Sequence, residues 1–431
     1  MRPTLPCSSW LRLAALCAAL AALAPSAFAQ PGVPDPARPV TARPLEFEFL
    51  GPAGGGRIAS ITGVPGDTAV WYVGSASGGV WKSTDGGHRF VPVFDSMDVQ
   101  AIGAVAVAPS KPAIVWAGTG EAWAIRDADI IGDGVYRSDD AGKTWRNMGL
   151  RETGRIARIL VHPSNPNVVY VCALGRTTAP QEERGVYRTT DGGATWTRVL
   201  FVDPNTGCSS LAMDAKNPKV LLAGMWQVEM HPWAMFSGGP SSGLWITHDG
   251  GSSWTQVQDP GLPRPPVGKI GVAIAPTNSN RMYALIQTAD QGSLWRSDNA
   301  GRSWKMVSWA RALIGRGGYY MHLAVSSGNP DEVLVANSGF WRSTDGGRTF
   351  RQVQWGGDNH DIWMDPRNPD HFGLTNDAGA RVTTTHGKSW NNISLPNAQM
   401  YHVAVDHQLP YWVYGNRQDD GTMRGSSAAP E

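Results

Sequence analysis

Short apolar stretches alternate with polar turns along most of this chain. Residues 104–108, 159–161 and 272–275 are apolar stretches that run into a proline or a polar turn. A second apolar stretch follows soon after, as at 168–171 and 333–335. No window repeats its apolar residues with the helical period of about 3.6. The pattern therefore predicts short β-strands joined by tight turns.

One motif recurs seven times between these strands. It reads Ser/Thr-x-Asp-x-Gly-x-Ser/Thr-Trp/Phe, with some variation at each position. Its closing aromatic residues are Phe90, Trp145, Trp196, Trp254, Trp304, Phe350 and Trp390. Successive copies are about 50 residues apart, which is a typical period for a propeller blade. Four short strands per repeat predict an all-β fold, a β-propeller of four-stranded blades with seven motif-bearing blades.

The acid of this motif is predicted to have a structural role. A carboxylate in a hairpin can accept hydrogen bonds from the backbone of its own turn, and the following glycine can supply a positive φ. The residues at this position are Asp85, Asp140, Asp191, Asp249, Asn299 and Asp345, and the seventh copy has Thr385 instead. We expect Asn299 to keep the hydrogen-bonding role and Thr385 to keep it only weakly.

Strand-like segments remain at the carboxyl end after the seven motif-bearing blades are counted. Residues 401–406 and 411–414 resemble the first two strands of an eighth blade, yet no eighth motif follows before Glu431. An incomplete blade exposes an unpaired strand edge. Either residues 45–50 complete this blade or the propeller of residues 45–431 is truncated. We favour truncation, with the native chain continuing into further blades.

The amino terminus has the features of an export signal. Arg2 and Arg12 precede an apolar run at 13–24, and Ala27 and Ala29 form a small-x-small cleavage pattern. The run is shorter than the roughly 20 residues that a membrane-spanning helix needs. We predict a signal peptide at 1–29, a Pro/Ala-rich leader at 30–44, and a secreted or periplasmic protein without stable membrane insertion. The alternative is a buried amino-terminal helix.

Composition narrows the possible partners. The chain has 37 basic and 36 acidic residues, so its formal charge is +1, which argues against nucleic acid as a partner. Of its four cysteines, Cys172 and Cys208 remain after the signal peptide. They could form a disulfide in an oxidising compartment or remain as two buried thiols. No motif for a metal or another cofactor is present, so we predict neither.

The repeated motif resembles the Asp-box, or BNR, repeat. Similar propellers occur in exported bacterial sortilin-like proteins often described as glycosyl hydrolases, in sialidases, in xyloglucanases and in photosystem II assembly factors. The resemblance implies the fold and says little about activity. Xyloglucanases imply a catalytic Asp in the second turn of the first blade, where this chain has Ala76. Their second catalytic acid lies in a second propeller, and sialidases imply a Tyr–Glu nucleophile pair that we do not identify here.

Two groups of residues are candidates for ligand binding. Arg57, Arg155 and Lys269 each precede the first strand of a blade, so they are expected around the central channel. There they could bind an anionic or hydroxylated ligand, or form buried structural ion pairs. The second group lies in long loops, where propellers commonly bind ligands. It comprises Trp123, Asp358 and His360.

Three loop acids are candidates for catalysis. Glu121, Glu229 and Asp361 lie near Trp and His residues, a mixture that is typical of carbohydrate sites. Paired carboxyls could act as acid and base on a glycoside. His360 with Asp358 and Asp361 could instead bind a metal, although solvated loop charges are the simpler interpretation. We predict a module that binds a peptide, a protein or a glycan at the channel mouth, with a glycoside hydrolase as the alternative.

Overall fold

The structure is a computed structural model that describes residues 56–122, 131–398, 400–417 and 421–428. The predicted signal peptide and leader, residues 45–50 and Trp123 lie outside these ranges. Among the described residues, no helix has the length and apolar character needed to cross a membrane. In the part of the chain that the structure describes, the fold is all-β apart from two short 3₁₀ turns, η2 (Arg151–Thr153) and η3 (Arg311–Leu313).

Seven antiparallel sheets form the blades, and each is built from consecutive strands. Blade one has β1 (Ile58–Val64), β2 (Asp67–Ser75), β3 (Val80–Ser83) and β4 (Val91–Pro92). Blade two has β5 (Ile102–Val107), β6 (Val115–Thr119), β7 (Val135–Ser138) and β8 (Arg146–Asn147). Blade three has β9 (Ile156–Val161), β10 (Val169–Ala173), β11 (Gly185–Thr189) and β12 (Thr197–Leu200).

Blade four differs from the others by a fifth strand. It has β13 (Thr206–Met213), β14 (Leu221–His231), β15 (Ala234–Ser237), β16 (Gly243–Thr247) and β17 (Thr255–Gln256). Blade five has β18 (Ile270–Ile274), β19 (Met282–Ile286), β20 (Leu294–Ser297) and β21 (Lys305–Ser308). Blade six has β22 (His322–Val325), β23 (Val333–Ala336), β24 (Phe340–Ser343) and β25 (Arg351–Val353). Blade seven has β26 (Asn359–Met364), β27 (Phe372–Asn376), β28 (Gly379–Thr383) and β29 (Asn391–Ile393).

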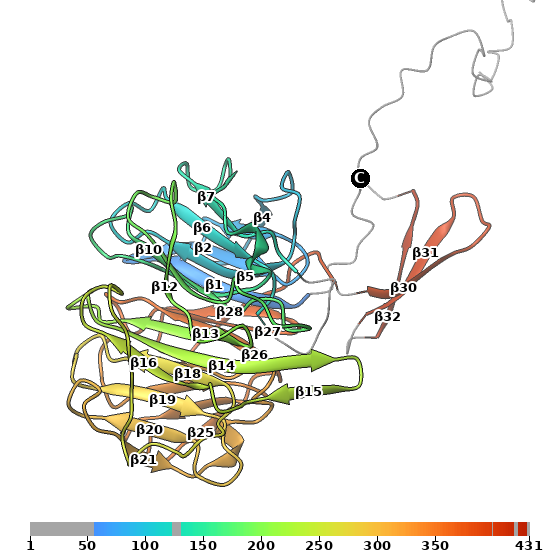
Figure 1. Ribbon diagram of the computed structural model, residues 1–431. Helices are drawn as coiled ribbons and strands as arrows, with labels where there is room; N and C mark the ends of the chain where they lie inside the picture. Colours follow the sequence, from blue (N-terminus) through green and yellow to red (C-terminus); the bar gives the residue numbers. More distant parts are fainter. Residues whose placement is uncertain (1–55, 123–130, 399, 418–420, 429–431) are drawn as a thin grey trace, which may run out of the picture. The chain divides into compact units, whose positions relative to one another are not determined.

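The seven blades close into a ring through their first strands. Each first strand packs on the first strand of the next blade, from β1 through β5, β9, β13, β18 and β22 to β26. The ring then closes because β26 and β27 pack on β1. Figure 1 shows the sheets arranged one after another in sequence order. The prediction of a β-propeller with seven blades is confirmed.

The strand order gives the ring two different faces. Each first strand starts on the face that carries the connections from second to third strands and from one blade to the next, which we call the loop face. The repeated motifs, joining third to fourth strands, lie on the opposite face, which we call the box face. Residues that precede a first strand or follow a second strand therefore lie on the loop face.

The core lies between neighbouring blades because both faces of each inner strand are covered. All residues of β1 and β18 are buried, whereas both residues of the outer strand β4 are exposed. Large aromatic side chains fill the space between sheets, where each removes a wide apolar surface from water. Trp71, Trp116, Trp226 and Trp295 are among the largest fully buried side chains. Tryptophan thus has a repeated structural use in the core.

The acid of each Asp-box accepts hydrogen bonds from its own hairpin. In blade three, Asp191 Oδ1 accepts from the Thr195 backbone N–H at 3.0 Å and from the Thr189 hydroxyl at 2.7 Å. Thr385 Oγ1 in blade seven accepts from the Ser389 backbone N–H at 2.9 Å. The boxes thus hold compact turns whose carbonyl groups point in fixed directions.

A cation from the preceding blade uses one of these carbonyl groups. On the third strand of four blades, a Lys or Arg donates to the carbonyl that follows the acid of the next box. The pairs are Lys82 with Ala141, Arg137 with Gly192, Arg188 with Gly250, and Arg296 with Gly346, at 2.6–3.0 Å. The box therefore stabilises its own turn and also the contact between blades.

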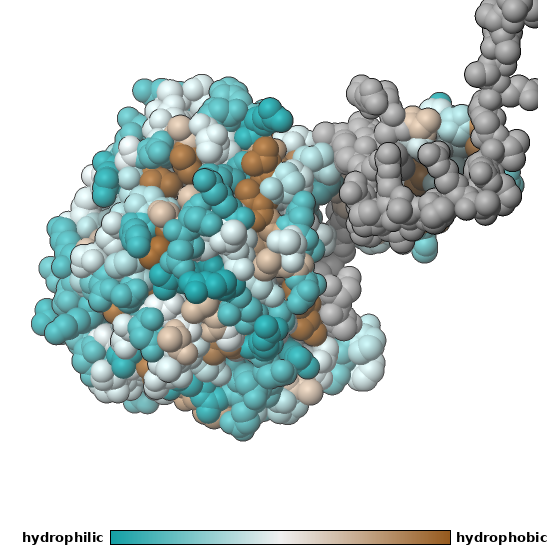
Figure 2. Space-filling view, turned by 90° about the horizontal axis from the view of Figure 1, so that it is seen from above, coloured by the Kyte–Doolittle hydropathy of each residue, from teal (hydrophilic) through white to brown (hydrophobic). Residues whose placement is uncertain are grey.

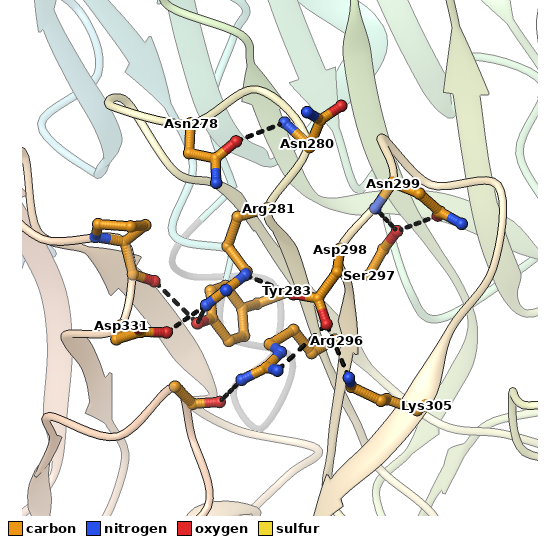
Figure 3. Close-up of polar contacts among 12 residues, drawn as sticks. Asn278, Asn280, Arg281, Tyr283, Arg296, Ser297, Asp298, Asn299, Lys305 and Asp331 are labelled. Atoms are coloured by element: carbon orange, nitrogen blue, oxygen red, sulfur yellow. Dashed lines mark hydrogen bonds and ion pairs between the residues drawn. The ribbon is translucent and has the colours of Figure 1, made fainter.

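A denser polar network joins blades five and six (Figure 3). Asp298 lies 2.7 Å from Arg281 Nε, 2.7 Å from Lys305 Nζ and 3.1 Å from Arg296 Nη2. Arg281 also contacts Asp331 of blade six. Despite partial burial, hydrogen bonds and charge from these cations lower the pKa of Asp298 to about 2. The network holds the two blades together on the box face.

Two further features complete the fold. Cys172 on β10 and Cys208 on β13 form a disulfide between blades three and four, which resolves the alternative that the sequence left open. The eighth group of strands is present as a sheet of its own, made of β30 (Met400–Val405), β31 (Trp412–Arg417) and β32 (Thr422–Ser426). It has one strand more than the sequence pattern predicted, and every residue of β30 is exposed.

Candidate functional site

Residues from blades one, two and seven meet on the loop face of the channel. Arg57 immediately precedes β1, Glu121 follows β6, and Asp377 follows β27. Arg57 Nε donates to Glu121 Oε1 at 2.5 Å, and Arg57 Nη1 lies 3.6 Å from Asp377 Oδ1. The Glu121 side chain is only 1% exposed, and this burial raises its pKa even though Arg57 acts in the opposite direction. The two predicted residues therefore form a buried ion pair.

A second set of side chains surrounds this ion pair. His360 is fully buried, with Nε2 3.0 Å from Asp377 Oδ1 and Nδ1 2.7 Å from the Ile58 carbonyl oxygen. The Tyr320 ring lies 5.6 Å from the His360 ring. Arg316, which is largely exposed, lies 3.4 Å from Asp358 Oδ2 and 3.2 Å from the Tyr320 hydroxyl. Contacts thus run from the buried pair toward solvent.

We call this group the mouth cluster. It consists of Arg57, Glu121, Arg316, Tyr320, Asp358, His360 and Asp377. Four of these residues were singled out from the sequence, namely Arg57, Glu121, Asp358 and His360. Asp377 was not among the named candidates. Arg316 and Tyr320 were missed because they lie in the connection at residues 309–321, between β21 and β22, which has no repeat signal.

Beneath the mouth cluster the channel is closed by side chains. Its remaining cavity has a volume of about 20 Å³ and is lined by residues from all seven blades, including Arg158, Lys269, His322 and Asp361. A space of this size holds one or two water molecules at most. Ligands of the size of a sugar or a peptide can therefore contact the channel only at its mouth.

Asp361 is held firmly inside this channel. It accepts hydrogen bonds from the Ser60 hydroxyl at 2.8 Å, the Ile61 backbone N–H at 3.1 Å and Arg158 Nη2 at 2.9 Å. Burial alone would raise its pKa, but Arg158 and these donors hold the pKa below its ordinary range. Asp361 is therefore an ionised carboxylate with its oxygens already in use.

The other cations predicted near the channel lie at different depths. Lys269 Nζ donates to the Tyr319 carbonyl at 2.8 Å, and burial lowers its pKa to about 7. Arg155 is fully buried in blade three, where Nη1 lies 3.5 Å from the Thr177 hydroxyl. Arg57 stacks over the Tyr319 ring at 4.7 Å. The structure therefore brings Arg57 and Lys269 to one residue, Tyr319, and places Arg155 beside Thr177.

Glu229 lies on the extension of blade four formed by β14 and β15. Its carboxylate is 2.9 Å from His231 Nε2 and is about half exposed. His231 stacks on Trp233, with ring centroids 4.8 Å apart, and Trp233 is 77% exposed. Within the described residues, no hydrogen bond or ion pair joins Glu229 to the mouth cluster, and Trp123 lies outside them.

A hollow on the loop face lies between blades four and five. A cavity of about 690 Å³ is lined by Pro240, Leu244, Asp259 and Arg264, among others. A second cavity of about 430 Å³ shares Val267 with it and reaches Gln287 and Arg311. Both are within or near the size range of small-ligand sites. In the view of Figure 2, hydrophobic residues form small separate patches among hydrophilic ones.

The geometry limits the chemistry of the predicted acids. Glu121 and Asp361 are paired with Arg57 and Arg158, so an arginine offsets the charge of each carboxylate. Within the described ranges, no group of three or more His, Cys, Asp or Glu side chains is arranged to hold a metal ion. The mouth cluster offers hydrogen-bond donors, acceptors and aromatic rings.

Comparison with known proteins agrees with this architecture. The family model described as sortilin, neurotensin receptor 3, matches residues 133–261. A xyloglucanase from a Paenibacillus species is 26% identical over 363 residues, which cover 76% of this chain and 33% of that enzyme. A probable oligoxyloglucan-reducing end-specific xyloglucanase from Neosartorya fischeri is 25% identical over 335 residues, covering 67% and 38% respectively. The chain thus spans about a third of the length of these relatives.

Solved structures show the same fold at lower identity. The GH74 xyloglucanase from Xanthomonas campestris matches with a TM-score of 0.62 at 16% identity, covering 87% of this chain and 60% of that one. The structure of YCF48 bound to D1 peptide matches with a TM-score of 0.51 at 16% identity, covering 79% and 97%. This chain is an Asp-box propeller that resembles both kinds of protein.

Proposed function

We propose that this chain is a ligand-binding propeller whose mouth cluster recognises a glycan or a peptide on the loop face. The observation that carries this proposal is the convergence of residues from separate blades into one hydrogen-bonded group at the end of a filled channel. Such a group is well placed to contact one ligand from several sides. Its outer members, Arg316 and Asp358, are the parts that a ligand would meet first.

The state of the acids favours binding over hydrolysis. A glycosidase needs two carboxyl groups that face the scissile bond, about 5–10 Å apart, with one of them protonated. Glu121 and Asp361 are each neutralised by an arginine instead. The turn after β2, where the resemblance to xyloglucanases implies a catalytic Asp, has Ala76, whose backbone N–H donates to the Arg57 carbonyl at 3.0 Å.

The similar proteins support two ligand classes. The xyloglucanases are named for a glycan, and YCF48 is described as bound to a peptide. A mixed group of cations, carboxylates and tyrosines suits either ligand, because both present many hydroxyl or amide groups. We further propose that residues 1–29 direct export, so that the ligand is met outside the cytoplasm.

A glycan and peptide array on the purified chain tests the proposal. Binding should be lost in Asp358→Asn and Arg316→Gln, which change exposed or half-buried groups of the mouth cluster. The matched control is Arg348→Gln, an exposed arginine on the box face that should bind as the parent does. Absence of binding in both arms, or equal binding by all four proteins, would refute the proposal.

A glycoside hydrolase is the second candidate, favoured by 26% identity to a xyloglucanase over a segment that covers 76% of this chain. The same array is therefore scored for released reducing ends. Release that disappears in Glu121→Gln or Asp361→Asn would establish hydrolysis and overturn the binding-only proposal. Glycan binding without release of reducing ends would contradict the hydrolase hypothesis.

A further inference from the structure

One position of the blade repeat breaks its own pattern in blade seven. The third strand of every other blade has an aromatic residue two positions before the Ser or Thr that opens the box. These residues are Trp81, Tyr136, Tyr187, Trp245, Trp295 and Trp341. The corresponding residue on β28 is Arg381. A cation therefore occupies a place between blades that six other repeats give to an aromatic ring.

The surroundings of Arg381 explain how the fold accepts a cation there. Its guanidinium lies between two tryptophan rings, 4.2 Å from the centroid of Trp355 and 3.9 Å from that of Trp390. The planar group packs against ring faces much as an aromatic side chain would. The residue is only 5% exposed. The flat guanidinium therefore fills the space between the indoles as well as an aromatic ring would.

The charge and the N–H groups of Arg381 are not satisfied in the same way. Arg381 makes no hydrogen bond or ion pair with any residue in the described ranges, and its Nε and Nη2 atoms are buried without an acceptor. Burial lowers its pKa to about 10. Buried polar groups in native proteins nearly always have a partner. Arg57 and Arg296 also have buried guanidinium nitrogens without an acceptor, but each has at least one acceptor elsewhere: Arg57 donates to Glu121, and Arg296 donates to Asp298 and Gly346.

The unsatisfied atoms define the shape of a partner. Nε and Nη2 lie on one edge of the guanidinium, and their N–H bonds point in parallel. This edge matches the two oxygens of a carboxylate, which it can bind through two hydrogen bonds. The Trp355 and Trp390 rings both pack against the guanidinium, so its Nε–Nη2 edge is the part that can donate to a carboxylate.

We propose that Arg381 forms a binding site for a carboxylate group on blade seven. The carboxylate would accept from Nε and Nη2 between the two tryptophans, and its source is a uronic acid sugar or an acidic peptide. The site is closed to solvent, and binding of the carboxylate requires displacement of Trp355, which is partly exposed and precedes Gly356 and Gly357. This site is distinct from the mouth cluster and does not depend on the function proposed for it.

Small carboxylates are the first probes. Binding of sodium glucuronate and of N-acetylaspartate is measured by calorimetry and by the shift of the melting temperature. Sodium chloride at equal ionic strength and neutral glucose are the controls. We expect a saturable rise in melting temperature with at least one carboxylate. Response to both indicates recognition of the carboxylate alone, whereas response to only one identifies its source as sugar or peptide.

The decisive variant is Arg381→Trp, which restores the aromatic residue of the other six blades. It should keep the fold and bind the carboxylate at least tenfold more weakly, whereas Arg348→Gln should bind normally. Arg381→Lys keeps the positive charge but lacks the two parallel N–H groups of the guanidinium. It serves the same purpose if Arg381→Trp does not fold. The proposal is overturned if the parent responds no more than in chloride, or if the folded variant binds as well as the parent. Unchanged glucuronate binding by Asp358→Asn separates this site from the mouth cluster.

Discussion

The disulfide between blades three and four should contribute a measurable part of the stability of the ring. Cys172 and Cys208 are both fully buried, their Cα atoms are 5.1 Å apart, and 36 residues separate them in sequence. The bond joins the second strand of one blade to the first strand of the next. Its loss therefore removes a covalent link across a contact that otherwise depends on packing.

The size of the effect follows from the length of the closed loop. Constraining a loop of about 36 residues in the unfolded chain corresponds to about 4 kcal/mol at 25 °C. For a folded unit of about 380 residues, the melting entropy is about 0.8 kcal/mol per kelvin. The double variant Cys172→Ala/Cys208→Ala should therefore melt about 5 °C below the oxidised parent, with a further decrease from the small cavities left by the sulfur atoms.

Differential scanning calorimetry measures this shift directly. Dithiothreitol should lower the melting temperature of the parent and leave that of the double variant unchanged, which is the control for other effects of the reductant. Mass spectrometry of alkylated, unreduced protein checks that the parent has no free thiols at these positions. Melting of parent and double variant within about 1 °C of each other would refute the reasoning.

Three further perturbations test other parts of the structure. Thr385→Asp should raise the melting temperature, because an acid at this position accepts more hairpin hydrogen bonds in the other blades; equal or lower melting would contradict this role. Glu121→Ala should lose about 3–5 kcal/mol of unfolding free energy in urea by leaving Arg57 buried without its acid, and Arg57→Met/Glu121→Leu should recover most of it. Burial and Arg158 lower the pKa of His322 to about 3, below the ordinary 6.5. The unfolded chain then binds more protons between these values, so stability should fall as pH falls from 6.5 to 3, and less steeply in His322→Phe.

The internal repeat made the fold predictable from the sequence. Seven boxes at nearly constant spacing imply the same four-stranded unit seven times, so the blade number and the basic strand order follow, whereas the extra strand β15 of blade four and the third strand β32 of the last sheet do not. The role of the motif was also accessible, because an acid followed by glycine in a hairpin has few other uses. The hydrogen bond from a third-strand cation to the carbonyl of the next box could not be predicted, since it depends on the angle between neighbouring blades.

The candidate site was predictable only in part. Position before the first strand singled out Arg57 and Lys269, and loop composition singled out Glu121, Asp358 and His360. Their pairing could not be read from sequence: Glu121 lies 64 residues from the arginine that neutralises it. Whether a carboxylate is a free acid or half of an ion pair is decided by a partner on another blade.

What the sequence alone determined about this protein is therefore its repeated local chemistry, from which the blade and the seven-membered ring follow. What only the tertiary structure decided is every property that depends on two blades at once. The disulfide, the filled channel, the neutralised acids and the unsatisfied edge of Arg381 are all of this kind. The physical reason is that hydrogen bonds and ion pairs act over a few ångströms, a distance that sequence separation does not report.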